Sequence, residues 1–255
     1  MVDNIWRSIE ILIYILQIIS VVLYFVSLEL NLYQLEYYTK IIPLLLLIPL
    51  VLTTWRRMLF TLGLILTGLG DIFLNQNIWG MSHAIGAIFF ILGYISTAFG
   101  FYPYKEGYQI GVFTESFLMM LTCSTCVFLI VYRSIKDNIW DVISCIVLLL
   151  IHSIVVPSYV AQPIKSYRCY NCQKMGFYGA IIVCLSDYML IIDVGYKINE
   201  GKQGRDGIIS AFPLRDYVVM LTYYAGQFMI AWSTRQWSCA ERKKLRQTIN
   251  EQKDR

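Results

Sequence analysis

Eight long apolar runs recur along the chain of 255 residues, and they constrain its fold more than any other feature. Each is close to the length that crosses a hydrocarbon core of about 30 Å as a helix. Because the runs are continuously apolar rather than alternating, they favour helices over the strands of a β-barrel. With 57% apolar and only 15% charged residues, the chain has more apolar surface than a soluble domain of this length can bury. The sequence predicts an all-α polytopic membrane protein, a compact bundle of about eight transmembrane helices. The runs lie near residues 9–30, 40–55, 58–75, 78–100, 110–132, 139–161, 175–196 and 214–233.

The basic residues predict the orientation. With eight spans both termini lie on one side, and 14 of the 21 Lys and Arg residues fall on that side. The positive-inside rule places both termini in the cytosol. We therefore expect a cytosolic N-terminus at 1–8, a transmembrane domain at 9–233 and a basic cytosolic tail at 234–255. The tail either rests on anionic lipid headgroups or is a solvated charged segment.

Residues that bind metals or act as nucleophiles are few. His83 and His152 lie on different predicted helices, and with an aspartate they would just complete a catalytic zinc site, which commonly has three protein ligands. Cys169 and Cys172 supply half of a structural zinc site, and no second pair lies nearby. No GxSxG motif of a serine hydrolase occurs. We expect neither a metal nor another cofactor.

Two aspartates interrupt the apolar runs. Asp71 lies in LTGLGDIFL and Asp187 in YGAIIVCLSDYMLIID. A charged side chain near the bilayer centre costs about 3 kcal/mol on insertion scales, so such residues generally face a protein interior and have a function. The alternative is that each one only braces a helix end, which suits Asp71 better because it lies nearer the end of its run.

Topology places the two aspartates at one depth. Their helices run in the same direction, and from starts near Met58 and Met175 both carboxyls lie roughly 18–20 Å from the cytosolic face. If the helices are neighbours, a like-charged pair in a partly dry cavity should hold one carboxyl protonated and the other ionised. A general acid and a general base require that arrangement. Small residues such as Gly63 and Gly179 precede each aspartate and favour close helix packing.

Four segments in the same order resemble the lysoplasmalogenase family, the YhhN-like membrane hydrolases, and in particular its animal members. They are TKIIPLLLL, TGLGDIFL, CLSDYML and FPLRDYVVMLTYYAGQFMIAWS. The resemblance covers residues 38–233. It implies hydrolysis of the vinyl-ether bond of a lysoplasmalogen to a fatty aldehyde and glycerophosphoethanolamine or glycerophosphocholine. It also implies an endoplasmic reticulum location, with a lysophospholipid substrate and membrane lipids as partners and no nucleic acid.

The chemistry of a vinyl ether suits the two carboxyls. Protonation of the β-carbon leaves an oxocarbenium ion for water to attack, and the hemiacetal then collapses. We expect Asp71 and Asp187 to share the roles of proton donor and water activator, with the assignment open. We expect Tyr223, Tyr224 and Gln227 to orient the water or the glycerol hydroxyl, and Lys40 to meet the phosphate. Interhelical hydrogen bonding by the tyrosines and snorkelling by Lys40 to the interface are the alternatives.

One departure from the family concerns a histidine. Members usually carry a histidine in the fourth helix, followed three residues later by a tyrosine. Aligning GAIFFILGYISTAFG with that pattern puts Leu92 and Ile95 at these positions. His83 is nine residues from Leu92, about 13 Å along a helix, and cannot easily replace the missing histidine. The chain must therefore manage without the histidine or supply it otherwise.

Two other classes of protein remain open. Buried carboxylates also relay protons or cations in transporters, although no interrupted helices in matched positions are evident. A catalytically impaired homologue that binds lipid would explain the missing histidine but not two costly carboxylates.

Overall fold

A computed structural model describes the chain as a bundle of helices. It covers residues 2–30, 32–54, 58–74, 82–101, 110–161, 167–203 and 217–233, and within these ranges the regular structure is helical throughout. The expected all-α fold is confirmed. The predicted tail at 234–255 lies outside the described residues. The helices are α1 Val2–Glu29, α2 Tyr33–Pro49, α3 Met58–Leu74, α4 Ser82–Phe101, α5 Ile110–Ile135, α6 Ile139–Val160, α7 Tyr167–Gln203, and an unlabelled helix at 217–233.

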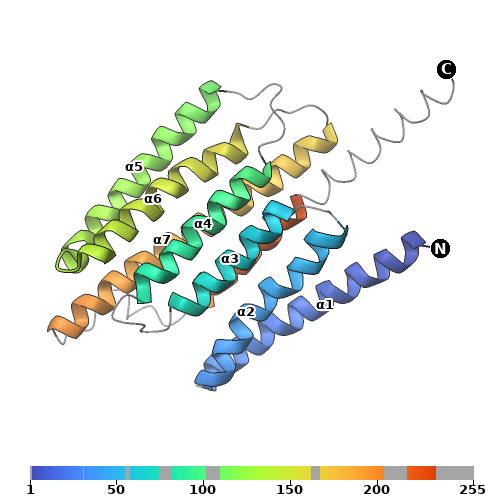
Figure 1. Ribbon diagram of the computed structural model, residues 1–255, viewed down its shortest axis with the longest axis horizontal. Coiled ribbons are helices and arrows are strands. Elements are labelled where there is room, and N and C mark those ends of the chain that lie inside the picture. Colours follow the sequence, from blue (N-terminus) through green and yellow to red (C-terminus); the bar gives the residue numbers. More distant parts are fainter. Residues whose placement is uncertain are drawn as a thin grey trace.

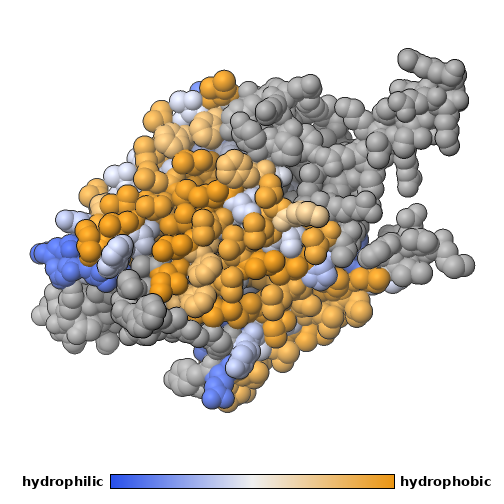
Figure 2. Space-filling view, in the orientation of Figure 1, coloured by the Kyte–Doolittle hydropathy of each residue, from blue (hydrophilic) through white to orange (hydrophobic). Residues whose placement is uncertain are grey.

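Five described helices are long and apolar enough to cross a membrane. They are Ser8–Glu29, Gln34–Leu52, Ile110–Ile135, Ile139–Ser158 and Lys174–Asp193. Shorter apolar helices lie at Met58–Phe73 and Ile85–Gly100, in α3 and α4. Figure 2 shows apolar side chains over most of the described surface on one face, with hydrophilic patches at its edges. Large apolar side chains such as Ile18 and Leu129 are more than 60% exposed, as lipid-facing residues would be.

The helices lie roughly side by side, and their order in space differs from their order in the chain (Figure 1). α5 and α6 form one side, α1 and α2 form the other, and α3, α4 and α7 lie between them. α3 packs mostly on α4, while α7 packs on α5 and α6. As predicted, α3 and α7 run in the same direction. The main packing partners of both are other helices, so α3 and α7 are not the direct neighbours that the sequence left as a condition.

Two helix ends differ from the prediction. α7 begins at Tyr167 rather than near residue 175, so that the segment with Cys169 and Cys172, expected as a loop, is helical. α2 ends at Pro49 in a π-helical turn, Leu50–Thr54.

Glycines let two pairs of helices meet at their backbones. A Cβ atom on Gly63 of α3 would lie 3.0 Å from the carbonyl oxygen of Gly93 on α4, and one on Gly93 would lie 3.0 Å from that of Gly63. Gly179 of α7 and Gly226 make the same kind of contact, with 2.8 Å in each direction. The close approach expected near Gly63 and Gly179 is therefore present.

The glycine contact between α7 and the helix at 217–233 leads to a testable prediction. In Gly226→Ala the new methyl group would lie 2.5 Å from Val183 Cγ2 and 2.8 Å from the Gly179 carbonyl oxygen. Because backbone must move to relieve this clash, we expect a loss of about 1–3 kcal/mol, measured as a lower apparent Tm in detergent. Gly111→Ala is the matched control, since nothing lies within 4 Å of its added Cβ. Equal melting temperatures for the two variants would contradict the prediction.

Candidate active site

Asp71 and Asp187 both face the interior of the bundle. Their relative exposures are 4% and 5%, so neither carboxyl meets lipid. The two groups are close enough to interact electrostatically. Each aspartate has separate partners, and the partners come from different helices.

Asp187 is bound by a histidine and a tyrosine. Nε2 of His152, on α6, lies 2.8 Å from Oδ2 of Asp187. The hydroxyl of Tyr94, on α4, donates a hydrogen bond to the same oxygen. The rings of Tyr94 and His152 also touch, with centroids 4.9 Å apart. Both described hydrogen bonds to Asp187 therefore end on Oδ2, which leaves Oδ1 for another group.

Backbone and ring contacts fix the orientation of the His152 side chain. Its Nδ1 lies 2.8 Å from the carbonyl oxygen of Leu148, one helical turn earlier in α6. The ring of Tyr188 packs against it with centroids 5.8 Å apart. Tyr188 is in turn held by a 2.6 Å hydrogen bond to Ser124 on α5. The imidazole is 97% buried and has one defined orientation, with Nε2 toward Asp187.

Asp71 has a cationic partner. Nζ of Lys40, on α2, lies 3.5 Å from Oδ1 of Asp71, and both side chains are buried. The hydroxyl of Tyr224 donates a 2.7 Å hydrogen bond to the backbone carbonyl of Lys40, which holds this turn of α2 against the helix at 217–233. Lys40 is thus directed into the bundle rather than to the membrane interface.

Two buried polar atoms beside this ion pair make no hydrogen bond of ordinary geometry with the described residues. They are Oδ2 of Asp71 and the hydroxyl of Tyr223. The Tyr223 hydroxyl nevertheless lies close enough to Asp71 and Thr67 to interact with both side chains. Buried polar groups are nearly always hydrogen-bonded, so the tyrosine hydroxyl and the carboxyl group serve as each other's polar neighbours in this part of the bundle.

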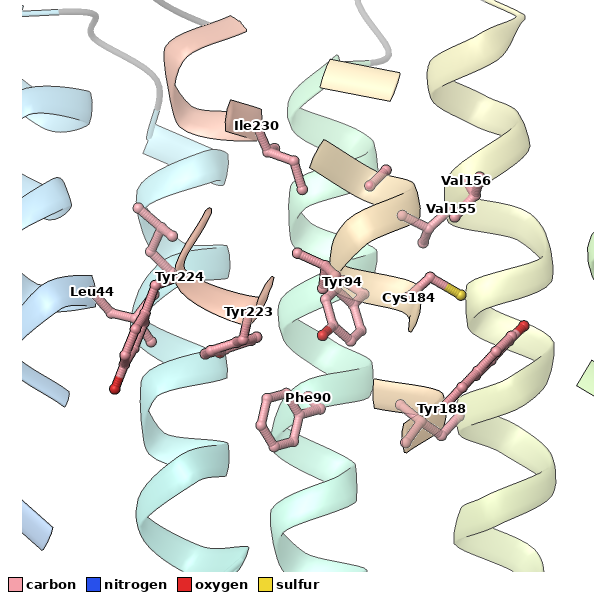
Figure 3. Close-up of a cluster of buried hydrophobic side chains, with 14 of the residues drawn as sticks. Leu44, Phe90, Tyr94, Val155, Val156, Cys184, Tyr188, Tyr223, Tyr224 and Ile230 are labelled. Atoms are coloured by element: carbon pink, nitrogen blue, oxygen red, sulfur yellow. The ribbon is translucent and has the colours of Figure 1, made fainter. Parts of the chain in front are cut away.

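The helix at 217–233 brings the two halves of the site together. Ser186, next to Asp187, donates a 2.7 Å hydrogen bond to the Val219 carbonyl of this helix. Two turns of that helix carry the remaining polar residues predicted from the sequence, Tyr223, Tyr224 and Gln227, all of which are buried. Figure 3 shows Tyr223 beside Phe90 of α4, and Tyr94 of α4 between Tyr223 and α7.

The predicted like-charged pair has a different form in the structure. Each carboxylate has its own basic partner, Lys40 for Asp71 and His152 for Asp187. Neutral pairs of this kind lower the cost of burying charge inside a membrane protein. No described hydrogen bond joins the two aspartates, so they do not form a single dyad that shares one proton between them.

The histidine that contacts Asp187 lies on the sixth helix rather than on the fourth. Leu92 and Ile95, the positions aligned with the family's histidine and tyrosine, line an outward-facing apolar groove of about 580 Å³ between α3 and α4. A histidine at Leu92, which is 46% exposed, would point away from Asp187. Tyr94 of α4 and His152 of α6 occupy the site instead, and neither was among the predicted site residues.

The described residues contain no group of three or more His, Cys, Asp or Glu side chains arranged to hold a metal ion. Cys123 and Cys126 are exposed on α5. The side chains of His83, Cys169 and Cys172 lie outside the described residues.

The comparisons with known proteins agree with the sequence motifs. The model of the YhhN family matches residues 35–234, a range that contains the six predicted site residues as well as Tyr94 and His152. No curated protein and no solved structure matches the chain. Because the match spans more than half of the chain and both buried aspartates, the chain belongs to the YhhN family.

Proposed function

We propose that the protein is a membrane hydrolase that cleaves the vinyl-ether bond of lysoplasmalogens. The products are a fatty aldehyde and glycerophosphoethanolamine or glycerophosphocholine. Membership of the YhhN family and the resemblance of its motifs to lysoplasmalogenases support this substrate. The observation that carries the proposal is the pair of buried carboxyls, one hydrogen-bonded to a histidine and the other paired with a lysine.

Acid–base catalysis is sufficient for this reaction. A proton is added to the β-carbon of the vinyl ether, a C–H bond forms, and the π bond breaks to leave an oxocarbenium ion. Water adds to the carbon that carries the positive charge and gives up a proton. The resulting hemiacetal collapses to aldehyde and alcohol, so one water molecule is consumed and the enzyme regains its proton. Positioned carboxyls in a site removed from bulk water can perform each transfer.

The other polar residues suit binding and orientation. We propose that two side chains orient water or the glycerol hydroxyl. They are the hydroxyl of Tyr223 and the amide of Gln227, one turn later. We propose Lys40 as a contact for the substrate phosphate in addition to its pairing with Asp71. Tyr224 acts on Lys40 through the hydrogen bond to its carbonyl. The endoplasmic reticulum location and the cytosolic termini belong to the same proposal.

Aldehyde release from a lysoplasmalogen by the purified wild-type protein in detergent tests the proposal. We expect release at the same rate with and without a chelator, because proton transfer by carboxyls needs no metal. The matched control substrate is a lysophospholipid with an acyl ester in place of the vinyl ether, which should remain intact because it offers no alkene carbon to protonate. An intact lysoplasmalogen would contradict the proposal and favour a transporter or a lipid-binding homologue, and loss of activity with the chelator would contradict the metal-free mechanism.

A further inference from the structure

The hydrogen bonds of His152 determine how many protons it shares with Asp187. A peptide carbonyl oxygen can only accept a hydrogen bond, so Nδ1 of His152, 2.8 Å from the Leu148 carbonyl, must carry a proton. The 2.8 Å contact between Nε2 and Asp187 Oδ2 then needs a second proton, because two lone pairs would repel each other at that distance.

That second proton has two possible positions. It is bound either to Nε2, which gives an imidazolium beside a carboxylate, or to Oδ2, which gives a neutral imidazole beside a carboxylic acid. The pair is electrically neutral in both forms, and both forms hold one proton that can be given away. The hydrogen bond from Tyr94 to Oδ2 favours the carboxylate form at rest, because an ionised oxygen is the stronger acceptor.

In the pair of Asp71 and Lys40 the corresponding proton stays on the lysine, because an amine is a much stronger base than an imidazole. An ammonium group 3.5 Å from Oδ1 favours the ionised carboxylate, and the hydroxyl of Tyr223 lies beside the same carboxyl group. As an ionised carboxylate, Asp71 is suited to accept a proton from water and to stabilise a nearby cation. The two aspartates therefore differ in what they can do.

We infer that Asp187 is the proton donor and Asp71 the water activator, and that His152 is a positioning residue that keeps a transferable proton on Asp187. This inference rests on the proposed function. Asp187 gives the β-carbon the proton that its Oδ2 shares with Nε2 of His152, and His152 is left as a neutral imidazole. The pair then carries one negative charge beside the oxocarbenium ion. Water attacks the cation and gives its proton to Asp71, from which it returns to the Asp187–His152 pair when the hemiacetal collapses.

The effect of pH on the pair depends on its surroundings. The titratable groups around it are Tyr94 on α4, Tyr188 and Cys184 on α7, Asp71 on α3 with its partner Lys40 on α2, and Tyr223 on the helix at 217–233. In the wild-type protein two basic groups compete to retain the proton, whereas a variant without the imidazole has only the carboxylate. Removal of His152 should therefore cause activity to be lost at a lower pH.

His152→Gln tests the role of the histidine. Its side-chain amide reaches the position of Nε2 and can donate to Asp187, but it cannot hold a transferable proton. We expect aldehyde release to fall about 10- to 100-fold at neutral pH, and the alkaline limit of the pH–rate profile to move to lower pH. Ser144→Ala, on the same helix, is the matched control, since its hydroxyl bonds to the Trp140 and Asp141 carbonyls of α6 outside the candidate site. We expect it to retain the wild-type pH profile.

Nitrogen NMR of histidine-labelled protein gives a readout that does not need activity. The chain has two histidines, so comparison with His152→Gln assigns the signals. We expect Nδ1 of His152 to be protonated at neutral pH, and Nε2 to carry or accept the second proton until Asp187→Asn removes it. A bare Nδ1, or an Nε2 signal unchanged in Asp187→Asn, would overturn the inference. So would an active His152→Gln with the wild-type pH profile.

Failure of the proposed function has a different signature. If the wild-type protein leaves lysoplasmalogen intact but NMR shows the shared proton, the inference about the pair of Asp187 and His152 stands and the proposed substrate is wrong. If the wild-type protein is active but NMR shows no shared proton, the proposed substrate stands and the assignment of Asp187 as the proton donor is wrong.

Discussion

Asp71→Asn and Asp187→Asn are each expected to lower aldehyde release by about 10²- to 10⁴-fold, the contribution that a general acid or base typically makes. Asparagine keeps the size of the side chain but can neither give up a carboxyl proton nor accept one from water. In Asp187→Asn the amide oxygen can still accept the hydrogen bond of Tyr94, whereas the proton shared with His152 is lost. The loss should therefore appear in kcat rather than in KM, because the groups that bind substrate are unchanged.

The chain offers a matched control for these variants. Asp141 lies in the first turn of α6, where its Oδ2 accepts a 2.9 Å hydrogen bond from Asn138, outside the candidate site. Asp141→Asn should retain nearly the wild-type rate. Full activity in either site variant, with the protein folded, would exclude that carboxyl from the chemistry.

The burial of the two aspartates inside the bundle could be predicted from the sequence, because a charge within an apolar run is costly and therefore rare. The periodic apolar runs likewise predicted the helices, and the small residues before each aspartate predicted the close packing that Gly63 and Gly179 make. These signals are local, since each depends on residues within a few turns of one helix.

The partners of the aspartates could not be predicted in the same way. His152 lies 35 residues from Asp187 and Tyr94 lies 93 residues from it. A single histidine in an apolar helix and one of 19 tyrosines carry no pattern that shows which residue they contact. The order in which the helices pack decides these contacts. Because α3 packs mostly on α4 while α7 packs on α5 and α6, the two carboxyls have different basic partners, Lys40 and His152.

Lys40→Met tests how much the buried ion pair with Asp71 contributes to stability and to aldehyde release. The side chains of Lys40 and Asp71 are 11% and 4% exposed, so loss of the ammonium leaves a buried carboxylate without its cation. Breaking a buried ion pair by removing one partner typically costs about 3–5 kcal/mol, and we expect a correspondingly lower apparent Tm in detergent. Aldehyde release should also fall, because Asp71 then binds a proton and no longer activates water.

The double variant Lys40→Met/Asp71→Asn separates stability from catalysis. Removing both charges leaves no unpaired ion, and replacing a buried pair by neutral groups is often close to neutral in stability. We therefore expect the double variant to melt well above Lys40→Met, while its aldehyde release stays as low as that of Asp71→Asn. In a double-mutant cycle the two substitutions should be strongly non-additive in stability. Additive losses of stability would mean that Lys40 and Asp71 are not coupled, and recovery of activity in the double variant would mean that Asp71 serves only to neutralise Lys40.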